Sequence, residues 1–243
     1  LSNIVLDELD WELERRGLSF VRYADDCNIY VKSERAGNRV MESITRFIER
    51  RLRLKVNASK SAVAPPEDRH FLGFRLYRDP EDGSVEVLLS KRSEKRVKAK
   101  IREMTPRNWG QSMKACIQGL NGYLKGWIGF FWIVTDAEER LLGNIEARMR
   151  RRLRAIKLRH WGRKRVIHRN FVRAGVSNRT AGRYVYDTKN SWWVLSKCLP
   201  AHRALPNSYF VDLGLMSLKD RRQEILTRHI IAQRQQMLPF GQL

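Results

Sequence analysis

The sequence has few cysteines and no long apolar run. Its three cysteines, Cys27, Cys116 and Cys198, lie far apart in a chain of 243 residues, and no two of them form a C-x-x-C pair. A sparse, odd count predicts neither a disulfide framework nor a zinc site, and it favours a reducing, cytoplasmic compartment. The most apolar stretch, residues 127–134, is much shorter than the roughly 20 residues that cross a bilayer, so no membrane partner is expected.

Acidic residues are scarce in the C-terminal two thirds of the chain. The whole sequence carries 48 Lys+Arg and 26 Asp+Glu, a net charge of +22. Residues 1–90 hold 15 basic and 16 acidic side chains, whereas residues 91–243 hold the other 33 and 10. Such an excess favours a polyanion, whether nucleic acid, an acidic membrane surface or an acidic protein. The asymmetry predicts two domains with different roles, residues 1–90 and residues 91–243.

Two amphipathic helices are expected in residues 1–90. Ser2 or Asn3 caps the first, and Gly17 follows its end. The side chains expected on its buried face are Ile4, Val5, Leu9 and Leu13. Ser33 caps the second helix. The buried stripe expected on it consists of Val40, Ile44, Phe47, Ile48 and Leu52.

Segments whose residues favour β-strands lie between and after these two helices. Residues 20–23 and 28–31 predict a hairpin with Asp25 and Asp26 at or beside its turn. Residues 55–57 suggest a short strand, and residues 71–77 and 85–89 predict a second hairpin around the turn at 79–83. Residues 1–90 therefore belong to the α+β class.

Residues 91–243 are predicted to be mainly helical. Segment 91–104 is a basic helix that Pro106 ends, and segments 111–133 and 137–159 have the spacing of two long helices. Residues 165–199 are expected to hold a shorter helix, a polar stretch and an aromatic segment. The last helix is expected at residues 218–236.

The strongest chemical signal is the carboxylate pair Asp25-Asp26 between two strands. Nucleotidyl transfer uses divalent metal ions that bind the attacking and leaving oxygens, and Mg²⁺ prefers carboxylate and phosphate oxygens. Adjacent carboxylates repel each other without a cation, which favours a metal site. The alternative is a solvated hairpin turn, since aspartate is common in turns.

The residues around this pair resemble a known family. Tyr23-Ala24-Asp25-Asp26 is similar to the palm signature of reverse transcriptases. Similar elements follow in the family's order: NASK at residues 57–60, FLGF at 71–74, LNGYLKGW at 120–127 and SWW at 191–193. The chain thus resembles, over nearly its whole length, bacterial-type group II intron reverse transcriptases, with the C-terminal part of the palm, the thumb and the maturase domain.

The resemblance implies roles for individual residues. Asp25 and Asp26 would be catalytic metal ligands for Mg²⁺, and Lys60 would supply a proton or positive charge to the leaving pyrophosphate. The residues implied in primer or template contact are Tyr23, Leu72 and Gly73. Lys60 is otherwise a plain surface lysine, and Gly73 is otherwise a bulge glycine in a strand.

The family also uses parts that this sequence does not contain. A further metal-binding aspartate and the fingers precede the position of Leu1 in the family. The chain alone is therefore expected to lack reverse-transcriptase activity, and an upstream palm and fingers polypeptide is an expected partner.

A run of basic residues in the C-terminal part predicts an RNA-binding surface. Its expected contact residues are Arg148, Arg150, Arg151, Arg152, Arg154, Lys157, Arg159, Arg163, Lys164 and Arg165. A solvated basic helix and a membrane-surface helix are the alternatives, and the scarcity of balancing acidic residues favours RNA.

These observations predict a fragment of an RNA-directed DNA polymerase with RNA-binding maturase activity in intron splicing and mobility. The expected partners are structured intron RNA and, in the full-length protein, a DNA primer or target and dNTPs. The alternatives are a non-catalytic RNA-binding splicing cofactor and a truncated relic without polymerase activity.

Overall fold

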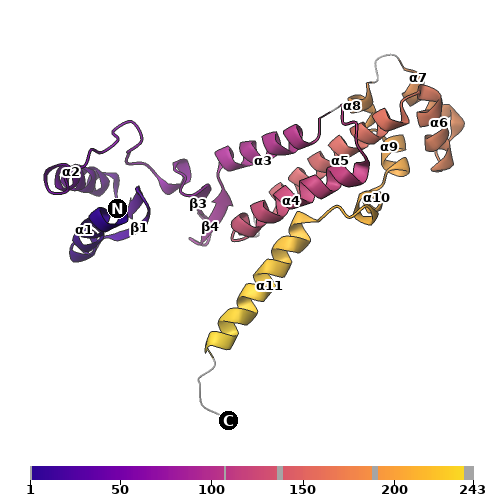
Figure 1. Ribbon diagram of the computed structural model, residues 1–243. Helices are drawn as coiled ribbons and strands as arrows, with labels where there is room; N and C mark the ends of the chain where they lie inside the picture. Colours follow the sequence, from indigo (N-terminus) through magenta and orange to yellow (C-terminus); the bar gives the residue numbers. More distant parts are fainter. Residues whose placement is uncertain (1, 107, 136–138, 188–190, 238–243) are drawn as a thin grey trace, which may run out of the picture. The chain divides into compact units, whose positions relative to one another are not determined.

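The computed structural model describes residues 2–106, 108–135, 139–187 and 191–237 (Figure 1). The chain forms two compact units, Leu1–Val85 and Glu86–Leu243. The first contains helices and β-strands and the second is mainly helical, which confirms the α+β class. Among the described residues, no helix has the length and apolar character that a membrane crossing needs.

The first unit begins with α1 (Ser2–Arg15), the strands β1 (Ser19–Tyr23) and β2 (Asp26–Tyr30), and α2 (Glu34–Arg50). β1 and β2 form an antiparallel hairpin, with Phe20 opposite Ile29. Ser33 caps α2 as expected, because its Oγ accepts a hydrogen bond from the Ala36 N–H at 3.2 Å. The core residues of this part are Leu6, Leu9, Leu13 and Ile44, with Phe20, Cys27, Ile29, Val40, Phe47, Ile48 and Leu52 packed against them.

The expected stripe on α2 is confirmed, but the expected face of α1 is partly wrong. Ile4 and Val5 are exposed by 74% and 40%, whereas Leu6 is buried. At 100° per residue, Leu6, Leu9 and Leu13 share one side of the helix and Ile4 lies on the opposite side. The expected cap is also wrong, because Ser2 already lies inside the helix.

A second hairpin follows the short 3₁₀ helix η1 (Pro66–Asp68). Its strands are β3 (Phe74–Arg78) and β4 (Val85–Leu89), which pair in a separate two-stranded sheet as expected. The strand expected at residues 55–57 is wrong. Arg53 adopts a left-handed φ of 55°, and no described strand pairs with the segment that follows it.

Three long helices form the body of the second unit: α3 (Lys91–Met104), α4 (Met113–Phe131) and α5 (Glu139–Trp161). They pack against one another in pairs (Figure 1). The fully buried residues between them include Ile101, Ile117, Leu120, Leu124, Ile145, Met149 and Leu153. All three were expected, within two residues at each end.

Five short helices come next: α6 (Lys164–Arg173), α7 (Asn178–Tyr186), α8 (Trp192–Leu195), α9 (Leu199–Ala204) and α10 (Asn207–Asp212). Residues of α6, α7, α8 and α9, together with Leu158 of α5, form a second core whose largest member is Phe171. The sequence predicted a single helix here. Helices of four to nine residues, such as α8 and α7, span too few turns to show a clear apolar period.

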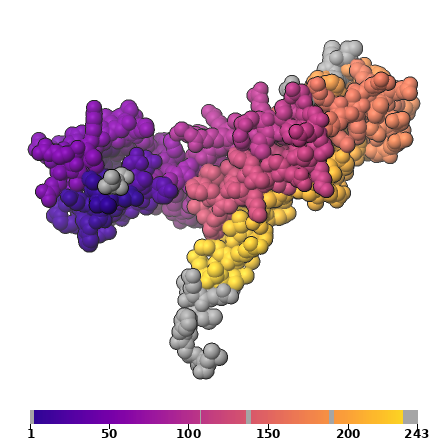
Figure 2. Space-filling model, viewed as in Figure 1, coloured from indigo at the N-terminus to yellow at the C-terminus, as the bar shows by residue number. Residues whose placement is uncertain are grey.

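The last helix, α11 (Leu218–Met237), confirms the expected one and packs against α4 and α5 (Figures 1 and 2). A buried carboxylate of α5 holds its first turn. Glu146 Oε1 accepts hydrogen bonds from the backbone N–H groups of Leu218 at 2.7 Å and Lys219 at 3.3 Å. Arg222, also buried, donates to the carbonyl oxygens of Trp132 and Val134 just beyond the end of α4.

Candidate functional site

The loop that joins β1 to β2 carries the two carboxylates. Tyr23 pairs with Asp26 at the end of the hairpin, so Ala24 and Asp25 form a two-residue turn. Ala24 adopts a positive φ of 54°, which costs free energy for a residue with a Cβ. Because side chains alternate along a strand, Asp26 lies on the same face as Tyr23, and the neighbouring Cys27 packs toward α1 and α2.

Asp25 and Asp26 are both exposed. Within the described part of the chain, neither carboxylate forms an ion pair or a side-chain hydrogen bond with another residue, so their oxygens are available to a ligand. Two adjacent carboxylates match part of the oxygen set that Mg²⁺ takes, with water and phosphate oxygens filling the other positions. No group of three or more His, Cys, Asp or Glu that could hold a metal occurs among the described residues.

Arg22 holds this turn against α1. Its Nε and Nη2 donate to the two oxygens of Asp10 at 2.7 and 2.5 Å, and its Nη1 donates to the Ala24 carbonyl at 2.8 Å. Hydrogen bonding to Asp10 raises the pKa of Arg22, so the guanidinium stays charged. The guanidinium therefore fixes the strained residue of the turn. The sequence did not reveal this role, because Asp10 lies twelve residues before Arg22 and in a different element, α1.

Lys60 is an exposed residue in the turn after α2. Its backbone N–H donates to the Asn57 carbonyl at 3.1 Å, and its carbonyl accepts from Arg69 Nη2 at 2.7 Å. No hydrogen bond joins its ammonium group to Asp25 or Asp26 in the described part of the chain. Its catalytic role therefore stays a prediction.

Leu72 and Gly73 form a tight turn immediately before β3. Phe71 and Phe74 exchange two backbone hydrogen bonds of 2.9 Å, and the φ angles of Leu72 and Gly73 between them are 52° and 88°. Two positive φ angles in a two-residue loop favour glycine and disfavour leucine. The glycine is thus required by the turn, and the strained leucine is partly exposed at its tip. Their contact with primer or template stays a prediction.

Most of the basic residues of α5 and the start of α6 fall into a buried group and an exposed group. Arg152 and Arg154 are buried. Arg152 donates to the Thr105 hydroxyl and to the carbonyls of Arg102 and Thr105. Arg154 donates to the Leu205 carbonyl at 2.9 Å and to Asn207 Oδ1 at 2.8 Å. Burial, and then the nearby Arg150, lower the pKa of Arg154 to about 10.

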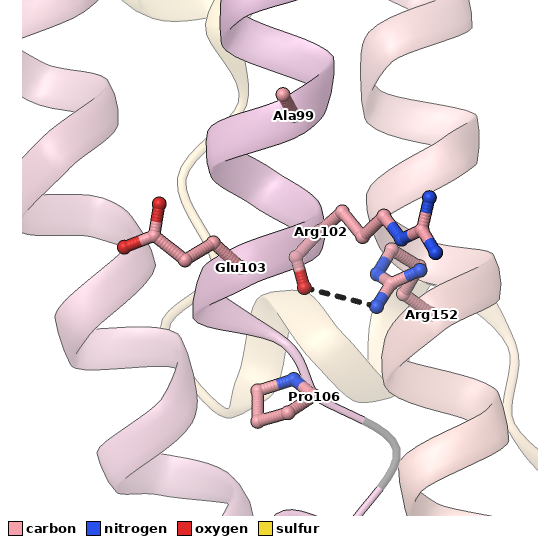
Figure 3. A pocket seen from close by; sticks show the side chains of 5 residues that line it. All are labelled: Ala99, Arg102, Glu103, Pro106 and Arg152. Carbon is pink, nitrogen blue, oxygen red and sulfur yellow. Dashed lines mark hydrogen bonds between the residues drawn. The ribbon is translucent and has the colours of Figure 1, made fainter.

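Arg102 and Arg152 also line an open cavity of about 630 Å³ between α3 and α5 (Figure 3). Figure 3 shows their two side chains on one side of α3, with Glu103 directed to the other. Ala99, Glu103 and Pro106 complete the lining. Because Arg152 already donates to protein oxygens around this cavity, it serves the packing of α3 against α5.

The second group of basic residues is exposed. Its members are Arg148, Arg159, Arg163, Lys164 and Arg165. In the described ranges of the chain, none of these five forms an ion pair with a carboxylate. Arg150 differs, because it pairs with Glu146 at 3.0 Å, and Lys157 is half-buried near the ring of Tyr209. The exposed group supplies positive charge that other side chains do not neutralise.

Two parts of the chain match known families. Residues 1–76 match the family model described as "Reverse transcriptase (RNA-dependent DNA polymerase)". Residues 94–175 match the one described as "Group II intron, maturase-specific domain". No curated protein matches the chain. The first match includes the Tyr23–Asp26 turn, and the second includes α5 and the exposed basic residues.

The hairpin with its carboxylate turn, within the first match, places the chain among the reverse transcriptases. The maturase-specific domain then specifies the kind of reverse transcriptase. The chain comprises the C-terminal part of the reverse-transcriptase domain and the maturase-specific domain of a group II intron reverse transcriptase.

Proposed function

We propose that residues 91–243 bind structured intron RNA as the thumb and maturase part of this protein. The observation that carries the proposal is the group of five exposed basic side chains without carboxylate partners at residues 148–165, inside the maturase-specific match. RNA phosphates would pair with these cationic side chains, and the counterions bound to the RNA would be released. Arg152 and Arg154 would act indirectly, by holding α5 in the fold.

We further propose that residues 1–90, the C-terminal part of the palm, contribute Asp25 and Asp26 to a Mg²⁺ site for nucleotidyl transfer. Bound Mg²⁺ stabilises the charge on the reacting phosphate oxygens. Asp25 and Asp26 bind the cation, while Arg22 keeps the turn in place. Tyr23, on the same face as Asp26, would support the template–primer, as would Leu72 and Gly73 at the second turn. Lys60 would carry positive charge to the leaving pyrophosphate.

The second candidate function is a non-catalytic RNA-binding splicing cofactor. It is favoured by the carboxylate count, since Asp25 and Asp26 supply only part of what a two-metal site uses. In that case RNA binding would be the whole activity of residues 1–243. A relic would bind neither structured RNA nor Mg²⁺ at these places.

The salt dependence of RNA binding tests the first proposal. We expect the logarithm of the affinity for structured RNA to fall steeply and linearly with the logarithm of salt concentration. A variant with Arg148, Arg159, Arg163, Lys164 and Arg165 all changed to Gln should have a shallower slope. The slope should decrease by roughly 0.7 to 0.9 for each phosphate that the variant no longer neutralises.

A variant with the same loss of charge in the first unit is the matched control. Arg35, Arg39, Arg50, Arg53 and Lys55 are also exposed. Changing these five to Gln should leave the salt slope close to that of the wild type. Equal slopes for the two five-residue variants would contradict the proposed RNA surface.

Mn²⁺ can replace Mg²⁺ as a paramagnetic probe of the carboxylate turn. We expect Mn²⁺ to broaden the backbone amide signals of residues 23–27 in the wild type, and the broadening to disappear when Asp25 and Asp26 are both changed to Asn. Asp82→Asn is the control, because Asp82 is an exposed carboxylate in the turn between β3 and β4. Broadening of the 79–83 turn that equals that of residues 23–27 would refute a specific metal site.

A further inference from the structure

The two tryptophans of α8 lie against α5. Arg151 stacks over Trp193, with its Cζ 3.8 Å from the ring centroid, and its Nη2 donates to the Trp193 carbonyl at 3.4 Å. Ser191 caps the short helix by accepting a hydrogen bond from the Val194 N–H at 3.4 Å. These contacts hold α8 at a defined place on α5. They therefore also fix the position of the neighbouring Trp192 on α5.

That side chain, Trp192, is 39% exposed. The Arg159 Cζ lies 5.2 Å from its ring centroid, within the range of a cation–π contact. Arg159 is itself exposed, and its guanidinium has no carboxylate partner among the described residues. An accessible aromatic ring and an unneutralised cation therefore lie together on the surface of the maturase-specific domain and its flank.

We propose that Trp192 and Arg159 form a binding site for an unpaired nucleotide, in which the base stacks on the indole and Arg159 contacts its phosphate. The inference rests on the proposed RNA binding and adds selectivity to it. Phosphate contacts alone do not discriminate between RNA structures. An indole can stack only on a base that has left its own helix, so this site selects loops, bulges or ends over continuous duplex.

Trp127, Trp161 and Trp11 are less suited to this role. Trp127 is buried, and Trp161 packs edge-on against Phe171 in the second core. Trp11 is more exposed, at 67%, but its indole N–H donates to the Asp7 carboxylate, whose charge would repel a phosphate. Exposure and a neighbouring free cation coincide at Trp192.

The test compares a short unstructured RNA with an RNA duplex of the same length, at one salt concentration, using the full 243-residue chain. We expect Trp192→Ala to weaken binding of the unstructured RNA by about five- to 150-fold, and duplex binding by less than about twofold. Trp192→Phe keeps an aromatic face and should stay within about threefold of the wild type. Trp11→Ala is the matched control and should change neither affinity.

Intrinsic fluorescence gives a second measurement in case Trp192→Ala perturbs folding. Unstructured RNA should quench the tryptophan emission of the wild type more than that of Trp192→Phe. Equal quenching, or a Trp192→Ala effect that is absent or equal for both RNAs, would overturn the stacking site. A wild type whose affinity for both RNAs does not respond to salt would instead contradict the proposed RNA-binding function, which is a distinguishable result.

Discussion

At the scale of single residues, register decides what the carboxylate turn presents. The antiparallel pairing places Tyr23 opposite Asp26 and Arg22 opposite Cys27. Asp26 and Tyr23 thus share the outer face, while Cys27 packs toward the helices. A shift of one residue would turn Asp26 into the core, and a charged carboxylate would be costly there.

Arg22→Lys should loosen the turn. A lysine cannot donate to both oxygens of Asp10 and to the Ala24 carbonyl in the fixed geometry of a guanidinium. Burial, and then the Asp10 charge, raise the pKa of the Cys27 thiol to about 11, so this thiol should react slowly in the native protein near neutral pH. We expect faster alkylation of Cys27 in Arg22→Lys, with a stability loss of about 1 kcal/mol.

Alkylation rates are measured by mass spectrometry of the separated cysteine peptides. Cys116 and Cys198 provide the control within the same molecule, because both belong to the second unit and should keep their wild-type rates. An unchanged Cys27 rate would show that Arg22 does not hold the turn.

At the scale of elements, α5 serves stability and binding with different side chains. Arg154 is 3% exposed and bonded to residues about fifty positions later, whereas Arg148 is exposed without a carboxylate partner among the described residues. We expect Arg154→Gln to lower the free energy of unfolding by roughly 2–4 kcal/mol, because it removes the hydrogen bonds of a buried guanidinium and leaves the carbonyl of the buried Leu205 without its donor. Arg148→Gln should change stability by less than about 0.5 kcal/mol.

RNA affinity should depend on these two residues differently. Under conditions where both variants remain folded, Arg148→Gln should weaken RNA binding and reduce its salt slope, and Arg154→Gln should not. Urea denaturation and filter binding measure the two properties. If Arg154→Gln lowered the salt slope while preserving stability, the division of α5 into these two groups would be wrong.

The start of α11 offers a second test at this scale. Glu146 accepts hydrogen bonds from the first N–H groups of α11, where a negative charge is also stabilised by the helix dipole. Glu146→Gln keeps the size of the side chain but removes the charge, and we expect a loss of about 1–2 kcal/mol in urea denaturation. Glu139→Gln is the control on the same helix. Its exposed ion pair with Lys219 at 3.6 Å should contribute little, so an equal loss in both variants would exclude capping.

At the scale of the whole molecule, charge separates the two parts of the chain. Residues 1–90 are nearly neutral, while residues 91–243 carry 33 basic and 10 acidic side chains. RNA should therefore be attracted to the helical unit by long-range electrostatics, and the palm part should contribute little to affinity.

Primer extension tests catalysis at this scale. We expect a polypeptide of residues 1–243 alone to add no nucleotide to a primer on an RNA template with Mg²⁺, since a two-metal site takes more ligands than Asp25 and Asp26 supply. A complete reverse transcriptase in the same assay is the positive control. Incorporation that disappears in Asp25→Asn would refute this expectation and favour polymerase activity in residues 1–243.

Local patterns allowed much of the fold to be predicted. The spans of α3, α4, α5 and α11, both hairpins and the Ser33 cap depend on apolar spacing and turn residues close together in the sequence. The reverse-transcriptase and maturase assignments rested on short motifs in a fixed order, and the family matches confirm them. The helices α7, α9 and α10 were missed because they are too short for a visible period.

The sequence by itself determined the long helices, the two hairpins, the carboxylate turn and the location of the positive charge, since each is a property of neighbouring residues. Tertiary structure alone decided which of these side chains are accessible. Arg154 and Arg159 look equivalent in the sequence, yet the first is bonded to Leu205 and Asn207 and the second lies over Trp192 at the surface. Burial depends on partners brought from distant parts of the chain, and periodicity within one helix does not contain that information.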